Sequence, residues 1–142
     1  MKEYFSTDQS EKKEIIEQIR QLLFEQKEVM FAFVFGSFLD SLSFRDIDVG
    51  IYVDGIAESQ FFDLELRISE VISDRCKMPF DIIDVKVLNT APSYFLNSIF
   101  KRGKLLFSRD QQLLTDMIEN SSLESIANEN IASQSLKELI PS

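Results

Sequence analysis

Two aspartates one residue apart, Asp46 and Asp48, are the residues whose type and spacing most directly suggest chemistry in this chain. They alternate with the apolar residues Ile47 and Val49, and a period of two is typical of a β-strand that turns both carboxylates to one face. Like charges held side by side are unfavourable unless water or a cation compensates them. The pair is therefore either a solvated strand edge or a set of oxygen ligands for a divalent metal such as Mg²⁺.

A Gly-Ser step, Gly36 and Ser37, precedes the aspartates. It follows the aromatic and β-branched run Phe31 to Phe35, which predicts a strand covered on both faces, and it breaks that run as a turn does. A strand, a turn and a second strand bring backbone N–H groups and the Ser37 hydroxyl near the carboxylates. This arrangement suits a cradle for Mg²⁺ and a triphosphate, with a solvated strand edge as the alternative that a lone Asp-x-Asp more often represents.

The order of these features resembles the signature of the polymerase-β-like nucleotidyltransferase superfamily: Gly36-Ser37, eight further residues, then Asp46-x-Asp48 on a following strand. The stretch from Phe80 to Pro92 resembles the third-aspartate strand of that family and the Leu-Asn-x-Ala-Pro turn after it. Three features in the right order are more specific than any one of them. The short chain resembles the minimal, MNT-type members. The resemblance implies an α/β (α+β) nucleotidyltransferase fold, with a short, mixed, twisted sheet and helices packed on it.

Two candidates exist for the third carboxylate, Asp81 and Asp84, and their odd separation places them on opposite faces of a strand. Counting back five residues from Asn89, as the family pattern implies, selects Asp84, with Asp81 as the alternative. The resemblance implies that Asp46 and Asp48 bind the metal on the triphosphate. The third carboxylate then accepts the proton of the attacking hydroxyl or helps to hold a second metal ion.

The loop between the Gly-Ser step and the aspartates differs from the family pattern. In the family this loop is commonly longer and carries small and basic residues that contact phosphates. Here Phe38 follows Ser37, and Arg45 is the one cation of the loop. Arg45 either contacts a phosphate or neutralises Asp46.

Composition limits the number of domains, the class of partner and the kinds of site that this chain can have. A chain of 142 residues is expected to form one domain, and its net charge of −9 argues against DNA or RNA as a partner. Because the chain has no histidine and Cys76 is its only cysteine, internal disulfides, His-containing zinc sites and His-based triads are excluded. No apolar run predicts a membrane span and the N-terminus does not resemble an export signal, so a cytoplasmic protein is expected.

Helical patterns flank the strands. Asp8 and Glu11 predict the start of a first helix, and a second helix has a stripe of apolar residues that ends near Cys76. A third helix starts at Pro92 and ends near Gly103. Its end carries Lys101, Arg102 and Lys104, which we interpret as favourable for the helix dipole, ahead of the alternative of contact with nucleotide phosphates. The apolar residues of the second helix are Phe61, Leu64, Ile68, Val71 and Ile72.

The last part of the chain differs in composition. We expect residues 1–109 to form the nucleotidyltransferase domain, ending in a short strand over Leu105 to Phe107, and residues 110–142 to form a helical or partly disordered tail. A second capping box at Ser121 and Glu124 predicts two short helices in that tail.

The resemblance also implies an activity and a partner. The activity is transfer of AMP from ATP to a hydroxyl with two Mg²⁺ ions. MNT-type proteins of this size resemble the antitoxins of HEPN–MNT toxin–antitoxin pairs, some of which adenylylate a tyrosine of the HEPN ribonuclease, so a HEPN-type helical toxin is the implied partner. Two alternatives stay open: an antitoxin that neutralises its partner by contact alone, and a transferase acting on a small molecule such as an aminoglycoside.

Overall fold

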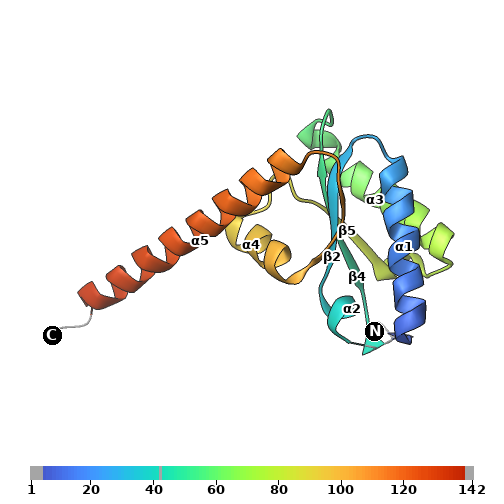
Figure 1. The fold of residues 1–142 in the computed structure, drawn as a ribbon, viewed down its shortest axis with the longest axis horizontal. Coiled ribbons are helices and arrows are strands. Elements are labelled where there is room, and N and C mark those ends of the chain that lie inside the picture. Colours follow the sequence, from blue (N-terminus) through green and yellow to red (C-terminus); the bar gives the residue numbers. More distant parts are fainter. Residues whose placement is uncertain (1–4, 42, 140–142) are drawn as a thin grey trace.

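A four-stranded mixed sheet forms the centre of the computed structural model, which describes residues 5–41 and 43–139 (Figure 1). From one edge to the other, its strands are β5 (Ile83–Val87), β4 (Ile47–Val53), β2 (Val29–Phe35) and β6 (Lys104–Ser108). β2 runs antiparallel to both β4 and β6, whereas β4 and β5 are parallel. The mixed sheet expected from the sequence is confirmed.

Helices cover both faces of this sheet (Figure 1). One face carries α1 (Gln9–Glu25) and α3 (Phe61–Cys76), and the other carries α4 (Ser93–Arg102) and the first part of α5 (Gln111–Leu139). Alternate residues of β4 such as Val49 and Ile51 are buried against the first pair of helices, while Phe31 and Phe33 of β2 pack with Ile99 of α4. The central strands are thus buried on both faces, which explains their continuous apolar sequence.

The first two long helices follow their sequence signals. Asp8 is the N-cap of α1, and its carboxylate accepts a hydrogen bond of 2.8 Å from the Glu11 backbone N–H, as expected. α3 begins at Phe61 after a short 3₁₀ turn, η1 (Glu58–Gln60). The expected core stripe of α3 is wrong at Val71, which is 37% exposed because it lies at the edge of the buried stripe.

Three segments differ from the sequence-based expectations. Between Gly36 and β4 the chain forms a single helical turn, α2 (Ser37–Asp40), and a two-residue strand, β3 (Ser43–Phe44), which pairs with β1 (Phe5–Ser6). The strand expected from residue 80 begins later, because residues 80–82 form a 3₁₀ turn, η2 (Phe80–Ile82). The third segment is the tail.

The tail forms one helix, α5, that extends beyond the body of the molecule (Figure 1). The capping-box interpretation of Ser121 and Glu124 is therefore wrong. Ser121 is buried and its hydroxyl donates to the Ile118 carbonyl oxygen (3.1 Å), while Glu124 accepts a hydrogen bond from Ser93 of α4. Packing on α4 outweighs the local preference of serine for a helix start. No helix in residues 5–41 and 43–139 has the length and apolar character needed to span a membrane.

Candidate active site

Three aspartates, Asp46, Asp48 and Asp84, lie toward one end of the sheet. Asp48 lies in β4, in register with Phe35 of β2 on one side and with Asp84 of β5 on the other. Paired residues on neighbouring strands point to the same face, and parallel strands lie about 4.8 Å apart, so Asp48 and Asp84 are neighbours on one face. Asp46 lies two residues before Asp48, immediately before β4 begins. The face is that of α4, because the Phe35 ring packs against the Phe95 ring of that helix (5.7 Å between centroids).

Asp81, the alternative third carboxylate, occupies a different place. It lies in η2, before the strand that carries Asp84, and it is exposed. The residue of β5 that pairs with Asp48 is therefore Asp84 and not Asp81. The choice of Asp84 stays a prediction, and its register with Asp48 supports it.

Gly36 brings the backbone against one of these carboxylates. Its φ is +83°, a conformation that only glycine adopts readily. A Cβ atom on residue 36 would lie 2.3 Å from Oδ2 of Asp48, closer than non-bonded atoms can approach. The absence of a side chain is therefore what leaves room for the Asp48 carboxylate. Strand β2 ends one residue earlier, at Phe35, so the end of this strand places Gly36 beside Asp48.

The loop residue Phe38 does not obstruct the site. Its side chain is fully buried and packs edge-on against Phe44, with 4.8 Å between ring centroids. The Lys12 ammonium of α1 lies over the Phe38 ring, 5.2 Å from its centroid, and donates a 2.7 Å hydrogen bond to the Ser41 carbonyl oxygen. Lys12 is only 4% exposed, and its two contacts hold α1 against α2 and against Ser41, the residue that follows α2. The shortened loop is thus held by the core.

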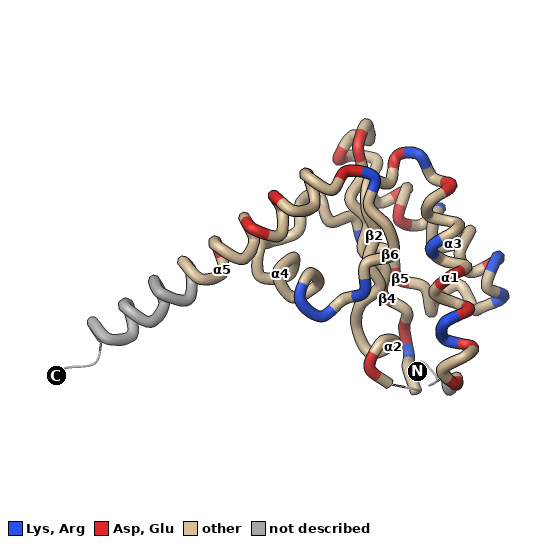
Figure 2. The backbone as a smooth tube through the Cα atoms, viewed as in Figure 1, with Lys and Arg blue, Asp and Glu red and all other residues tan. Residues whose placement is uncertain are grey.

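A hollow of about 260 Å³ opens beside Gly36, between α2 and α4. Arg102 contributes a cation to its wall and Asp40 an anion. Figure 2 shows the basic residues at the C-terminal end of α4, where Arg102 lies next to exposed Lys101, which does not line the hollow. The lining residues are Phe35, Gly36, Ser37, Asp40, Phe95, Ser98, Ile99 and Arg102.

The α4 wall of this hollow is not predicted from the sequence. The basic cluster at the end of the helix is a signal for it, but the sequence alone favours the helix dipole over phosphate contact as its role. Arg45, chosen instead as the basic residue for phosphates, is exposed and does not line the hollow. Only the packing of α4 across β2 shows that Arg102 and Ser37 share a wall, although 65 positions separate them in the sequence.

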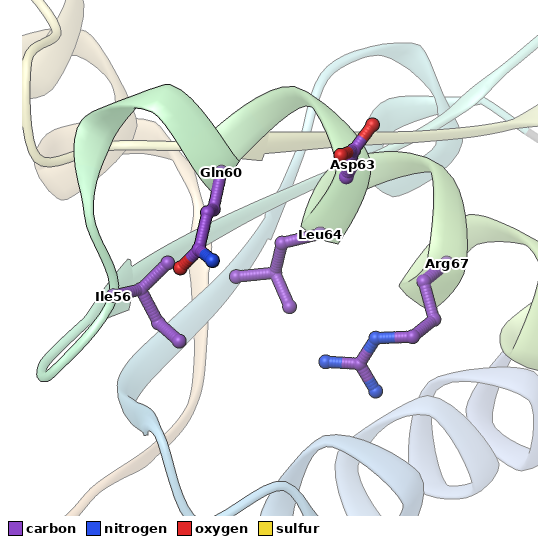
Figure 3. A pocket seen from close by; sticks show the side chains of 5 residues that line it. All are labelled: Ile56, Gln60, Asp63, Leu64 and Arg67. Atoms are coloured by element: carbon purple, nitrogen blue, oxygen red, sulfur yellow. The ribbon is translucent and has the colours of Figure 1, made fainter.

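A second hollow lies at the other end of the sheet and is separate from the carboxylates. Its volume is about 270 Å³. Figure 3 shows its five lining residues around the start of α3. Ile56 of this hollow follows the C-terminal end of β4, whereas Asp46 precedes its N-terminal end. A seven-residue strand separates the two places by about 20 Å. Arg67 in this hollow is paired with Glu28 (3.0 Å).

Comparison with known proteins identifies the family. A family model described as "Polymerase beta, Nucleotidyltransferase" matches residues 17–112, about two thirds of the chain. The chain belongs to this nucleotidyltransferase family. A comparison with curated proteins found no match.

Chains of solved toxin–antitoxin structures share the fold. One is a chain of a Shewanella oneidensis complex described as a tri-AMPylated HEPN toxin with an MNT antitoxin; it is 14% identical, with a TM-score of 0.63 over 92% of this chain and 99% of that one. Another belongs to a toxin–antitoxin structure with AMP-PNP, 15% identical, with a TM-score of 0.64 over 89% and 98% of the two chains. A third, from an MntA–HepT complex, is 14% identical, with a TM-score of 0.57 over 94% and 100%.

The donor set of this nucleotidyltransferase fits a divalent cation by type. Carboxylate oxygens are the ligands that Mg²⁺ prefers, and Asp48 and Asp84 share a face, with Asp46 at the entry to the same strand. Because Gly36 has no side chain, the Asp48 carboxylate has room close to the backbone at this position. Within the described part of the chain, however, no three His, Cys, Asp or Glu side chains are gathered closely enough to hold a metal ion. The aspartates therefore fit a divalent cation in the type of their donor atoms and in the face of the sheet that Asp48 and Asp84 share.

Proposed function

We propose that this nucleotidyltransferase transfers AMP from ATP to a hydroxyl group of a partner protein, with Mg²⁺ as cofactor. The observation that carries the proposal is the junction of Gly36, Asp48 and Asp84. A glycine without room for a side chain faces one carboxylate, a second carboxylate lies in register beside it, and a hollow opens next to the glycine. Such a junction suits a triphosphate on one side of the carboxylates and an attacking hydroxyl on the other.

In this proposal the hollow beside Gly36 receives the nucleotide. Ser37 donates its hydroxyl to a phosphate oxygen, and Arg102 supplies the positive charge that phosphates require. Phe95 offers an aromatic surface for the base. Asp40 in the same wall disfavours an anion close to it, so the triphosphate lies on the Arg102 side.

The transfer step uses the carboxylates. The acceptor hydroxyl oxygen forms a bond to the α-phosphorus of ATP, the bond from that phosphorus to the oxygen bridging to the β-phosphorus breaks, and pyrophosphate leaves with that electron pair. Asp84 accepts the hydroxyl proton. Asp46 and Asp48 would hold Mg²⁺, which would neutralise the negative charge on the triphosphate. Gly36 keeps its backbone close to the phosphates because no side chain intervenes.

The acceptor class is inferred from shape and charge. The fold is similar to chains of toxin–antitoxin complexes, one of them described as containing a tri-AMPylated HEPN toxin. The net charge of −9 favours a basic protein as partner. We therefore propose a HEPN-type helical toxin as the partner and a tyrosine hydroxyl as the acceptor, in the cytoplasm.

A contact-only antitoxin is the second candidate. It is favoured by the exposed apolar residues Leu123 and Ile126 on α5, which suit a protein contact. Phe38, which departs from the family pattern, does not argue for it, because that ring is buried and does not line the hollow.

Labelling separates the two candidates. The purified chain is incubated with Mg²⁺, ATP labelled on the α-phosphate and a lysate of the source cells, beside Asp48→Asn and the matched control Asp54→Asn, an exposed aspartate after the other end of β4. We expect a labelled protein with the wild type and with Asp54→Asn, and none with Asp48→Asn. Full labelling by Asp48→Asn would refute the mechanism. If the wild type labels nothing and does not bind Mg-ATP by calorimetry, the contact-only function stands.

A further inference from the structure

A third hollow, of about 240 Å³, lies near Asp84 and runs along the outer edge of β5. We call it the β5 groove. Its walls are the first half of α3 (Phe62, Glu65, Leu66), the turn η2 (Phe80, Asp81) and β5 itself, including Asp84. β5 is an edge strand of the sheet, with β4 as its one neighbour among the described residues. The groove therefore lies beside a strand edge that the body of the molecule does not pair.

Large apolar side chains are exposed around this groove. Phe62 is 68% exposed, Phe80 49% and Leu66 41%. Phe62 and Leu66 are four residues apart in α3, so they lie on one side of the helix, one turn from each other. Exposed apolar side chains that gather at a hollow, rather than being scattered singly, mark a binding surface.

The polar part of the groove is mainly acidic. Glu65, Asp81 and Asp84 contribute carboxylates, and Lys86 is the one cation among its lining residues. The Glu65 carboxylate accepts the Val87 backbone N–H (2.8 Å), which closes the far end of the strand edge and leaves the part near Asp84 open. Charge complementarity thus favours an occupant that carries a lysine or arginine.

Asp84 connects this groove to the candidate active site. It lines the groove and is in register with Asp48, whose other flank faces Gly36 and the nucleotide hollow. A two-substrate transfer needs its substrates to approach the reacting centre from different sides. The nucleotide hollow lies on the Gly36 side of the carboxylates and the β5 groove lies on the Asp84 side.

We infer that the β5 groove binds the acceptor as an extended polypeptide segment. Its apolar side chains pack on Phe62, Leu66 and Phe80, a basic side chain faces Asp81 and Glu65, and its hydroxyl reaches Asp84. Main-chain groups of the segment pair with the open part of the β5 edge. This inference rests on the proposed function for the role of the hydroxyl, while the binding itself requires no transfer.

A peptide array tests the groove without ATP. The probe is a randomised peptide array with a fixed central tyrosine, screened with the fluorescently labelled full chain. We expect the bound peptides to be enriched in large apolar residues and in Lys or Arg near the tyrosine. Leu66→Ser should weaken binding of the best peptide about tenfold, as truncation of an apolar anchor does. The matched control is Leu105→Ser, because Leu105 is also 41% exposed but lies on β6, the opposite edge of the sheet.

A charge reversal gives an independent reading. Asp81→Lys should shift the preferred peptides from basic to acidic, whereas Asp54→Lys, at the other end of the sheet, should not. Both aspartates are exposed, and circular dichroism verifies that each variant is folded. Because the array uses no ATP, a chain that never transfers AMP still reports on the groove.

Several outcomes would overturn the inference. These are no enrichment on the array, enrichment for acidic peptides, or equal effects of Leu66→Ser and Leu105→Ser. Loss of self-association in Leu66→Ser, seen by sedimentation without loss of peptide binding, would assign the groove to a second copy of this chain instead.

Discussion

Replacing Gly36 with alanine adds a single methyl group at the point where the chain faces Asp48. Two costs follow from the geometry. The first is backbone strain, since φ is +83° and ψ is −164°, a region that is nearly restricted to glycine and costs about 1–3 kcal/mol for other residues. The second is a collision with the Asp48 carboxylate.

The collision sets the expected loss of activity. The new Cβ would start 2.3 Å from Oδ2 of Asp48, and ordinary contact begins at 3.4 Å. The carboxylate oxygen or the loop must therefore move by about 1 Å, and a displacement of this size at a reacting centre costs on the order of 100-fold in rate. We expect Gly36→Ala to lower AMP transfer about 100-fold while the domain stays folded.

Gly55→Ala is the matched control. Gly55 also has a positive φ, +76°, but a Cβ there would meet nothing within 4 Å. It therefore bears the strain without the collision. Urea denaturation should show both variants destabilised by about 1–3 kcal/mol. Transfer of labelled AMP, measured at a temperature where both are folded, should fall only for Gly36→Ala. Wild-type transfer by Gly36→Ala, or an equal loss in Gly55→Ala, would refute the reasoning.

Three further predictions concern other parts of the molecule. Lys12→Met removes the ammonium over Phe38, so we expect faster amide hydrogen exchange in residues 36–41 and weaker Mg-ATP binding by calorimetry. Unchanged exchange would contradict the conclusion that Lys12 holds this segment against α1. Arg102→Gln should weaken Mg-ATP binding about tenfold and Lys101→Gln should not, since only the former residue lines the hollow; equal effects would remove Arg102 from the nucleotide site. Burial raises the pKa of the Cys76 thiol against an opposing effect of a nearby arginine, so iodoacetamide should label Cys76 more slowly at pH 8 in the native than in the urea-unfolded chain.

The raised pKa of the Cys76 thiol also determines how its contribution to the stability of the fold depends on pH. Because the folded-state pKa is raised, the thiol contributes stability that is fully present below the unfolded-state pKa of about 8.5. That contribution is lost as the pH rises through the folded-state value. A native labelling rate equal to that of the unfolded chain would contradict the burial argument.

Local signals in the sequence determined much of the fold. Alternation over 46–53 predicted β4 with its aspartates on one side, and Asp8 predicted the start of α1, because strand period and helix capping depend on residues close in sequence. The same kind of signal failed at Ser121. Whether that serine starts a helix or continues one depends on the packing of α5 against α4, which the local sequence does not contain.

The candidate site divides in the same way. The sequence by itself supplied Gly36, Ser37, Asp46 and Asp48, which lie within thirteen residues, and it left Asp81 and Asp84 as alternatives. Strand pairing decided which of these two lies beside Asp48, because register is a property of two strands together.

Only the tertiary structure placed Arg102 in the wall of the hollow beside Gly36, buried Phe38 under Lys12, and opened the β5 groove beside Asp84. Each of these depends on how a helix packs against the sheet. The packing direction is set by the summed burial of many apolar side chains, so no short stretch of sequence contains it.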